Sequence, residues 1–306
     1  MELDMTKGNP TGLLLKFIIP LVIGNVFQQL YNMVDTIIVG RFVGVQALAA
    51  VGATGTIMFL IIGFMQGLTT GFTVLTAQRF GAGDEKGLKL SVGNACVLSA
   101  LITVVMTVIS VVGMDWLLKV MNTPADIYDM ARSYILIICQ GMAFNILYNL
   151  LSSFLRAVGN SKVPLYSLMV SAFVNIILDM LLVVVIPMGV AGAAIATVIA
   201  QGGGGVFCMI YLIRKVPLMH FGKEHLKLEH QCVMNQLGIG IPMALQFSIT
   251  AVGTILVQAA LNTFGSVAVA AYTAACKVEQ LVTQPYSAMG MTMATYSAQN
   301  RGINDL

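Results

Sequence analysis

The sequence predicts an all-α polytopic membrane protein, and three observations support this fold class. Of the 306 residues, 58% are hydrophobic and only 9% are charged, whereas roughly 25% are charged in a typical soluble domain. Apolar runs of about 20 residues, the length that crosses a bilayer as a helix, recur along the whole chain. Short segments rich in glycine, proline, asparagine and aspartate separate these runs. So few charges could not cover the surface of a soluble protein of this size.

Eight apolar runs are predicted to be membrane-spanning helices. In chain order they are Leu14–Val39, Leu48–Thr76, Leu90–Val112, Tyr128–Phe154, Val163–Ile186, Val190–Ile213, Asn235–Leu261 and Val267–Ser297. The polar N-terminus leads directly into the first run, without the short apolar core and cleavage site of a secretory signal. Pro20, Pro242 and Pro285 fall within runs, where each removes a backbone hydrogen bond and favours a kink.

The basic residues are divided unevenly between the two sides of the predicted helices. Three of them, Arg41, Lys119 and Arg132, lie on the side opposite the N-terminus. Twelve lie on the N-terminal side: Lys7, Lys16, Arg79, Lys86, Lys89, Arg156, Lys162, Arg214, Lys215, Lys223, Lys227 and Arg301. Because cytoplasmic loops are enriched in lysine and arginine, we expect a multi-pass protein of the plasma membrane with a cytoplasmic N-terminus.

One long polar connection, Arg214–Cys232, interrupts the series of apolar runs. It contains all three histidines, His220, His225 and His230, at a spacing of five residues. This spacing does not place them on one helical face, so no zinc site is expected. We predict a cytoplasmic linker over residues 214–233, which could include an amphipathic helix lying on the membrane.

An internal repeat connects the start of the chain to its end. Gly44–Ala53 (GVQALAAVGA) is similar to Gly265–Ala274 (GSVAVAAYTA) at an offset of 221 residues. The motif Ala77-Gln78-x-x-Gly81 recurs at the same offset of 221 as Ala298-Gln299-x-x-Gly302. Ile19-Pro20 matches Ile241-Pro242 at an offset of 222. The seventh predicted helix therefore restarts the pattern of the first.

This repeat predicts the domain organisation. Both copies begin on the same side of the membrane, so the repeat is parallel and is related by an axis along the membrane normal. We expect a six-helix N-terminal lobe over residues 1–213, the linker, and a partial C-terminal lobe over residues 234–306 that holds helices 7 and 8. A complete second copy would give twelve helices, so we expect a C-terminally truncated chain that lacks four of them.

Polar residues within the predicted spans are the candidates for function, because burying them in hydrocarbon is costly. Asp35 shares a helical stripe with Tyr31, Gln28 and Asn32. One interpretation is an acid in a cavity whose proton or cation occupancy is coupled to substrate binding. The alternative is an acid near the end of the helix that caps backbone groups or is hydrated.

Asp179 is the second acidic candidate within a predicted span. Asn175 and Ser171 precede it by four and eight residues, on one helical face. An acid and an amide so placed can bind Na⁺ through oxygen atoms or hold a protonated carboxyl group. The alternative is a packing role in which Asp179 bonds backbone or threonine groups. Neighbouring helices could add Tyr134, Asn149, Thr197 and Gln201.

Other classes of protein and site find little support in the sequence. The net charge of +3 is spread over short loops, which argues against nucleic-acid binding. No His-Glu-x-x-His or Gly-x-Ser-x-Gly motif is present, so we expect neither an enzyme nor a bound cofactor. Five widely spaced cysteines suggest no disulfide framework. The run Gly202–Gly205 favours close helix packing.

Several motifs in order resemble those of the multidrug and toxic compound extrusion (MATE) transporters. They are QQLYNMVDTIIVGRFVG at Gln28–Gly44 with the ALAAVG and TAQRFGAGD that follow, then Arg156–Asn160 (RAVGN), Asn175–Asp179 (NIILD) and Gly240–Pro242 (GIP). The resemblance implies an exporter of two six-helix bundles that exchanges lipophilic, often cationic, small molecules for H⁺ or Na⁺ by alternating access. It also implies a monomer when the chain is full length, with membrane lipid around it.

The resemblance also assigns roles to individual residues. Asp35 matches the acid of the family's first helix, while Asn175, Asp179 and Thr197 match residues of its DinF-like branch. Tyr134 and Asn149 are looser matches, and Gln28 and Tyr31 extend the Asp35 stripe. The glutamate of the NorM-like branch is replaced here by Thr250. The resemblance therefore favours H⁺, with Na⁺ at Asp35, Asn175, Asp179 and Thr197 as the alternative ion.

Two further functions remain open at the level of sequence. Transporters of this type are related to flippases of lipid-linked sugar precursors, and a shared fold does not determine the substrate. A chain with only part of its second lobe could also be a fragment without transport activity of its own.

Overall fold

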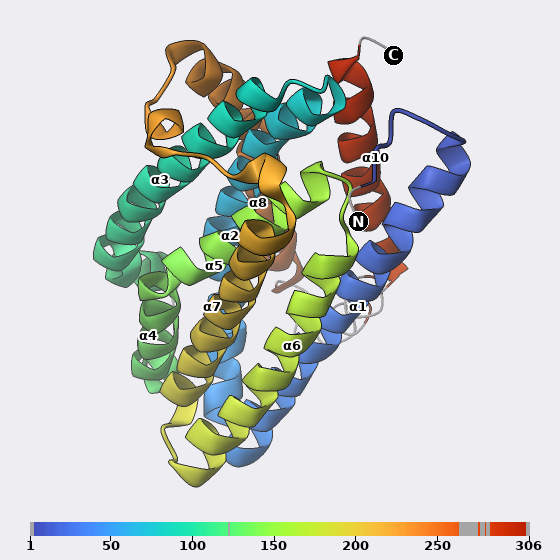
Figure 1. The fold of residues 1–306 in the computed structure, drawn as a ribbon. Helices are drawn as coiled ribbons and strands as arrows, with labels where there is room; N and C mark the ends of the chain where they lie inside the picture. The colour runs from blue at the N-terminus through green and yellow to red at the C-terminus, as the bar shows by residue number, and fades with distance from the viewer. Residues whose placement is uncertain (1–2, 122, 263–274, 276–278, 280–281, 304–306) are drawn as a thin grey trace.

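The protein is a bundle of long helices in the computed structural model, which describes residues 3–121, 123–262, 275, 279 and 282–303 (Figure 1). The described helices are α1 (Pro10–Phe42), α2 (Val45–Gly81), α3 (Glu85–Val120), α4 (Ala125–Gln140), α5 (Met142–Ala157), α6 (Lys162–Asp179), the π-helix η1 (Met180–Val185), α7 (Gly189–Lys215), the short 3₁₀ helices η2 (Pro217–Met219) and η3 (Lys223–Leu226), α8 (His230–Asn262) and α10 (Gln284–Gly302). The all-α prediction is confirmed.

Six described helical segments are long and apolar enough to cross a membrane: Pro10–Phe42, Ile57–Gly81, Glu85–Val120, Lys162–Val185, Gly189–Lys215 and His230–Thr254. The pair α4 and α5 supplies a seventh crossing if the two helices are counted as one span. These segments correspond to the first seven predicted spans. Much of the eighth, Val267–Ser297, lies outside the described residues, and α10 covers its end.

The predicted single helix over Tyr128–Phe154 is wrong in one respect. α4 and α5 are separate helices, bent by 49° relative to each other at Gly141. A β-carbon at Gly141 would overlap the side chain of Val198 on α7. The glycine therefore allows α7 to approach the bend, a tertiary contact that the continuous apolar run did not reveal.

The described linker does not contain the amphipathic helix that was one of its predicted forms. It contains the two short 3₁₀ helices η2 and η3 instead. The buried side chain of Asn94 on α3 holds this segment in place. Its Oδ1 accepts a hydrogen bond from the Glu229 backbone N–H at 2.9 Å, and its Nδ2 donates to the Lys227 carbonyl at 3.2 Å. Backbone groups bonded in this way to α3 do not need a helix to satisfy them.

The three prolines occupy two kinds of position. Pro20 and Pro242 lie inside α1 and α8, and both helices continue through the proline. Pro285 instead lies in the first turn of α10. At that position the missing N–H has no partner within α10 to lose. The helical residue Val282 and the turn at Thr283 stand directly before α10, so the break in the helix falls just ahead of Pro285.

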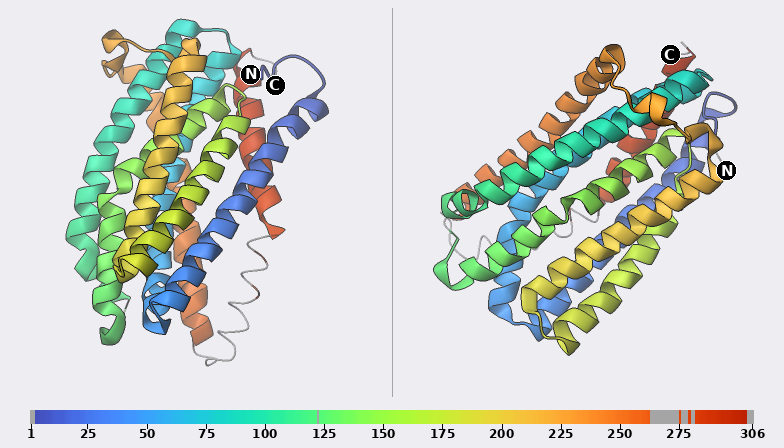
Figure 2. Two further views of the ribbon diagram at one scale, coloured as in Figure 1. Left: turned by 60° about the horizontal axis from the view of Figure 1, so that its bottom comes forward. Right: turned by 60° about the vertical axis from the view of Figure 1, so that its left-hand side comes forward.

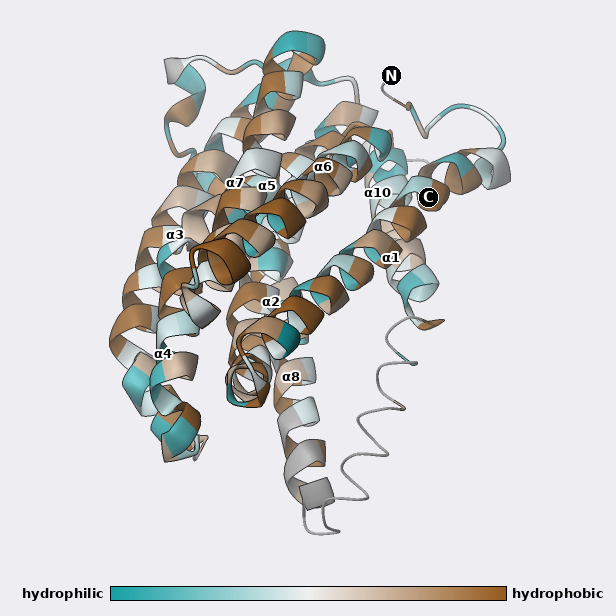
Figure 3. Ribbon diagram, turned by 90° about the horizontal axis from the view of Figure 1, so that it is seen from below, coloured by the Kyte–Doolittle hydropathy of each residue, from teal (hydrophilic) through white to brown (hydrophobic). Residues whose placement is uncertain are grey.

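The outer surface of the bundle is apolar, as expected for a protein that faces lipid. Val104, Val108, Val112 and Trp116 form an exposed stripe along α3. In Figure 3 hydrophobic residues cover much of the helix lengths, while hydrophilic residues gather near helix ends and connections. Because a soluble protein of this size rarely exposes so large an apolar area, this surface supports a multi-pass membrane protein.

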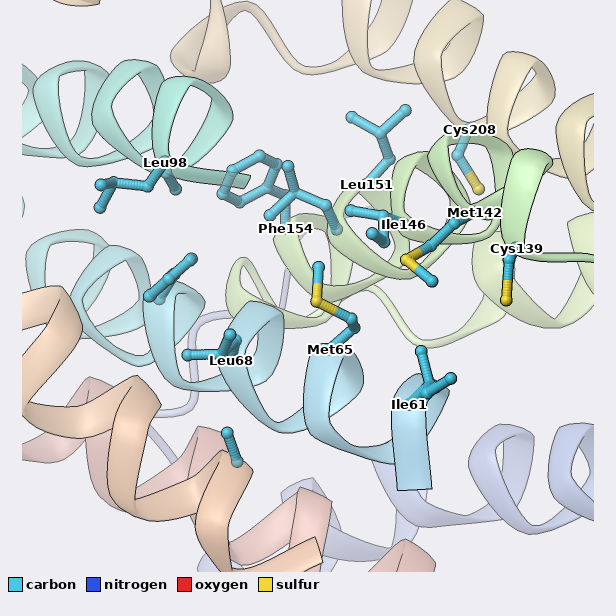
Figure 4. Packing of buried hydrophobic residues seen from close by; sticks show 14 of the residues in the cluster. Ile61, Met65, Leu68, Leu98, Cys139, Met142, Ile146, Leu151, Phe154 and Cys208 are labelled. Carbon is cyan, nitrogen blue, oxygen red and sulfur yellow. The ribbon is translucent and has the colours of Figure 1, made fainter. Parts of the chain in front are cut away.

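The largest hydrophobic core lies where α2 packs against α5 and its neighbours. Ile61, Met65 and Leu68 follow one face of α2, and Leu151 and Phe154 of α5 lie opposite them (Figure 4). Their spacing of three and four residues is that of one helical face. α2 is thus anchored to the first part of the chain through this face.

A second face of α2 carries glycines and packs against α8. Gly63, Gly67 and Gly71 are spaced by four residues, so they form one smooth stripe. A β-carbon at Gly67 would lie 2.6 Å from the Cα of Ala244, and one at Gly71 would overlap the Cα of Gly240. The backbones of the two antiparallel helices therefore touch along this stripe.

Both ends of the described chain lie at the same end of the bundle, as the left view of Figure 2 shows. We call this end the N-terminal face. α1, α3, α6 and α8 begin there, and α2, α5, α7 and α10 end there. The connection that contains η2 and η3 belongs to the same face.

We predict that Gly67→Ala lowers the free energy of unfolding by about 1–3 kcal/mol, since the added methyl group must separate two packed backbones. Gly55→Ala is the matched control, because it also lies on α2 and a β-carbon there would meet no neighbouring atom within 4 Å. Thermal unfolding in detergent measures both variants. Equal melting temperatures for the two would contradict close α2–α8 packing.

Candidate functional site

Two buried carboxyl groups from different helices meet inside the bundle. Asp35 of α1 is 8% exposed and Asp179 at the end of α6 is 0% exposed. Their side chains lie within hydrogen-bonding reach of each other. Two ionised carboxylates at this separation repel, and neither has a hydrogen to donate. The arrangement therefore suits a shared proton or a bound cation.

Asp179 occupies an unusual place in its helix. It is the last α-helical residue of α6, and the six-residue π-helix η1 begins directly after it. The backbone N–H of Met180 is shared between the carbonyls of Ile176 and Ile177. π-Helical turns are rare and occur frequently at functional sites.

Asn175 and Thr197 complete the surroundings of Asp179. With its amide oriented to satisfy both groups, Asn175 donates to Asp179 Oδ2 at 3.1 Å and accepts from the Thr197 backbone N–H at 3.3 Å. Asn175 therefore connects α6 to α7 and fixes one oxygen of the acid.

Among the described residues, three buried oxygen atoms around this centre lack a hydrogen-bond partner: Asp35 Oδ1, Asp179 Oδ1 and Thr197 Oγ1. Unpaired buried polar atoms are costly and rare in folded proteins. All three are oxygens, which are the ligands that hard cations such as Na⁺ prefer. The set thus has capacity for one further ion or proton donor.

Two tyrosines lie close enough to both acids to interact with them electrostatically. They are Tyr31 on α1 and Tyr134 on α4. Tyr134 is buried in a hydrophobic cluster that also contains Ile38 and Val183. These apolar neighbours strengthen electrostatic interactions at the acid pair by excluding water.

A small polar cavity of about 40 Å³ lies beside the acid pair, lined by Gln28, Tyr31, Asn145, Tyr148, Asn149, Leu168, Ser171, Ala172, Ala200 and Gln201. Asn145 is its central residue: it donates to Gln201 Oε1 at 2.9 Å and accepts from Asn149 Nδ2 at 2.9 Å. A polar space of this size suits a few water molecules and is too small for a drug-sized ligand.

A much larger cavity of about 670 Å³ lies between the first helices of the chain and the pair α8 and α10. Its lining residues are Asn25, Gln28, Gln29, Asn32, Phe59, Gln66, Thr70, Thr73, Val74, Ala77, Ser153, Arg156, Ala157, Met243, Gln246, Phe247, Gln284, Ser287, Gly290, Met291, Ala294, Thr295 and Ala298. Side-chain amides dominate the polar part of this lining. Arg156 is the one charged residue among these described lining residues.

The polar stripe on α1 connects the large cavity, the small cavity and the acid pair. Gln28 lines both cavities, Tyr31 lines the small one, and Asp35 forms the acid pair. These residues succeed one another at intervals of three and four along one helical face. A movement or rotation of α1 would therefore act on the large cavity and the acid pair together.

Residues 20–181, more than half of the chain, match the model of the family described as MatE. The chain belongs to the MatE family. Two curated relatives are probable multidrug resistance proteins of Bacillus subtilis. YoeA is 32% identical over 296 residues, which cover 94% of this chain and 64% of YoeA. YpnP is 29% identical over 303 residues, which cover 99% of this chain and 67% of YpnP.

A solved structure confirms the MatE-family fold. It is described as the outward-facing conformation of a multidrug resistance MATE family transporter of the MOP superfamily, and it matches with a TM-score of 0.92 at 24% identity. The match covers 99% of this chain and 67% of that chain. Our chain thus spans about two thirds of the length of the relatives that it matches.

In this MatE-family chain the predicted site residues fall into two neighbouring groups. Asp35, Asn175, Asp179, Thr197 and Tyr134 surround the acid pair. Gln28, Tyr31 and Asn149 line the small cavity beside it. None of the residues that surround the acid pair lines the large cavity. Pro20 lies farther along α1 toward its start.

Sequence reasoning missed two features of the site. Asn145 was not singled out, although it precedes Asn149 by four residues, and this spacing could have marked a polar face on α5. The amides of the large cavity were also missed beyond α1. Gln66 and Gln246 are isolated polar residues in apolar runs, so only the packing of α2 against α8 brings them together.

We predict that Asn145→Ala lowers the free energy of unfolding by about 1–3 kcal/mol, because it leaves buried amide groups of Gln201 and Asn149 without their partner. Asn235→Ala on the exposed surface of α8 is the control. Thermal unfolding of Asn145→Ala, Gln201→Ala and the double variant tests the link. Strictly additive effects would show that the two amides are not coupled.

Proposed function

We propose that this MatE-family chain exports small molecules by an ion-coupled mechanism in which the Asp35–Asp179 pair holds the coupling ion. One observation carries the proposal: two buried acids from different helices lie within hydrogen-bonding reach of each other. Such a pair costs free energy unless a proton or cation joins it. The names of the relatives YoeA and YpnP support multidrug export as the activity.

The exported molecule binds in the large cavity in this proposal, because about 670 Å³ is the volume of a typical small-molecule site. Side-chain amides can accept from and donate to many ligands, which suits lipophilic and often cationic compounds of varied shape. Alternating access would expose this cavity first to one side of the membrane and then to the other. The N-terminal face is cytoplasmic in this scheme.

In this proposal α1 couples the acid pair to the large cavity. With the acid pair deprotonated, Asp35 and Asp179 repel and the polar stripe of α1 favours one position. Binding of an ion removes the repulsion, so α1 settles against α6. Gln28 moves with the helix and alters the large cavity. A ligand that binds the large cavity in only one of these two positions of α1 is released when the ion binds, so the ligand and the ion are exchanged.

We favour H⁺ as the coupling ion because a single proton satisfies both carboxyl groups at once. Na⁺ is the alternative, since Asp35, Asp179, Asn175 and Thr197 offer four side chains that carry oxygen ligands. The two ions differ in what drives export. A protonophore abolishes proton-coupled export, whereas removal of sodium abolishes sodium-coupled export.

We predict that Asp35→Asn abolishes export while leaving the protein in the membrane. The neutral amide removes the site for the ion but keeps the shape of the side chain. Accumulation of ethidium in efflux-deficient bacterial cells measures export, and a membrane immunoblot measures the protein level. Asp129→Asn, which replaces an exposed acid on α4, is the matched control.

The comparison is made with the chain by itself and with a fusion to the remaining third of YoeA, because the match covers 64% of that relative. Unchanged ethidium export in Asp35→Asn, in whichever form is active, would overturn the role of the acid pair. Loss of export in Asp129→Asn as well would show that the assay reports general damage.

Arg156 supports a second candidate function, the flipping of a lipid-linked precursor. A guanidinium group binds phosphate through paired hydrogen bonds, and no acidic side chain accompanies Arg156 among the described lining residues of the large cavity. An anionic diphosphate headgroup would suit this lining, with its lipid tail in the bilayer.

We predict for this second function that Arg156→Gln weakens binding of an anionic lipid diphosphate at least tenfold without affecting ethidium. Arg214→Gln at the exposed end of α7 is the control. Binding measurements on purified protein, such as microscale thermophoresis, compare the variants. Equal affinity in Arg156→Gln and the parent would exclude this function for the cavity.

A further inference from the structure

The two copies of the repeated Ala-Gln-x-x-Gly motif meet each other at the N-terminal face. The first copy ends α2 and the second ends α10. A β-carbon at Gly81 would overlap the backbone carbonyl oxygen of Gln299. In the same way, a β-carbon at Gly302 would overlap the carbonyl oxygen of Gln78. Each glycine thus receives the backbone of the other copy, in a reciprocal contact.

This contact lies directly beneath the large cavity. Ala77 and Ala298, the residues that open the two motifs, both line the cavity. Together with Ala157 of α5 they form a small buried hydrophobic cluster. The following residues, Gln78 and Gln299, belong to the glycine contact. The cavity floor on the N-terminal side therefore consists of the two motifs and the end of α5.

The N-terminal segment of the chain ties this floor together. The side chain of Gln299, 0% exposed, accepts a hydrogen bond from the Met5 backbone N–H at 2.9 Å and donates to the Ala157 carbonyl at 2.8 Å. Asn300 Nδ2 donates to the Met5 carbonyl at 3.3 Å. The Leu3 N–H bonds the Val158 carbonyl at 3.2 Å.

The same segment is also held by apolar contacts. The Met5 side chain is 1% exposed and packs in a cluster with Phe17, Leu21 and Ala288. Residues 3–5 therefore lie between the end of α5 and the end of α10 and bond to both. A terminal segment is usually poorly ordered unless it is tied down in this manner.

We propose that the paired Ala-Gln-x-x-Gly motifs and residues 3–5 form a gate that closes the large cavity toward the N-terminal face. The glycines allow the ends of α2 and α10 to touch. Gln299 holds this contact to α5 through the Ala157 carbonyl and to residues 3–5 through the Met5 N–H. Opening toward this face requires the motifs to separate and the bonds of Gln299 to break. The proposal rests on the proposed function in assuming that the cavity opens to both sides.

Thiol labelling in membrane vesicles tests the gate without any transport assay. The five native cysteines, Cys96, Cys139, Cys208, Cys232 and Cys276, are replaced by alanine. Ala294→Cys on α10 then places a thiol in the lining of the large cavity. A membrane-impermeant maleimide is added to vesicles that expose either the N-terminal face or the opposite face.

The parent is expected to label at Ala294→Cys faster from the opposite face than from the N-terminal face. Gly81→Ala and Gly302→Ala are expected to raise labelling from the N-terminal face at least fivefold, because the added methyl groups hold the motifs apart. Gln299→Leu should act in the same direction by releasing Met5 and Ala157. Labelling from the opposite face reports that each variant still inserts and folds.

A matched glycine on α2 serves as the control. A β-carbon at Gly55 would meet no neighbouring atom within 4 Å, and Gly55 does not line the large cavity. Gly55→Ala should therefore label like the parent. The gate is overturned if Gly81→Ala and Gly302→Ala match this control, or if the parent labels as fast from the N-terminal face as from the opposite face. Neither result depends on export or on the acid pair.

Discussion

The close contact between α2 and α8 is the constraint on which the rest of the structure depends. α2 uses two faces at once: an aliphatic face packs on α5, and the glycine stripe Gly63–Gly71 packs on α8. Helix association in lipid relies on such close backbone approach, since lipid tails remove the hydrophobic driving force. α8 contacts the glycine stripe of α2, and the end of α10 contacts the end of α2. The large cavity occupies the space left between these two helices and the first helices of the chain.

The acid pair depends on a second set of contacts, made within the first helices. α1 brings Asp35, α6 brings Asp179 at its transition to η1, and Asn175 ties α6 to α7. Gln28 of α1 lines the large cavity and the small one, and Asp35 of the same helix belongs to the acid pair. An ion and a larger molecule can therefore bind at different places and still influence each other through a single helix.

Sequence reasoning found what a membrane imposes on each helix separately. Apolar length located the spans, and Asp35 and Asp179 were each singled out because hydrocarbon excludes such residues. Their meeting was not predicted. Sequence reasoning could not find features that arise between helices. The bend at Gly141 depends on Val198, the linker conformation depends on Asn94, and the cavity amides become neighbours only through packing. The π-helix after Asp179 has no marker in hydropathy.

The internal repeat shows how a one-dimensional pattern becomes a contact in space. Two segments related by a parallel repeat point the same way through the membrane, so equivalent residues lie at equal depth. If the segments pack about their shared axis, each contact between the two copies occurs twice, with the partners exchanged. Gly81 against Gln299 and Gly302 against Gln78 have this relation, because Gly302 is the counterpart of Gly81 and Gln299 is that of Gln78. A repeated glycine is therefore required twice, because a larger residue at either position would separate both halves of the contact. Only small residues and backbone fit where the two copies cross.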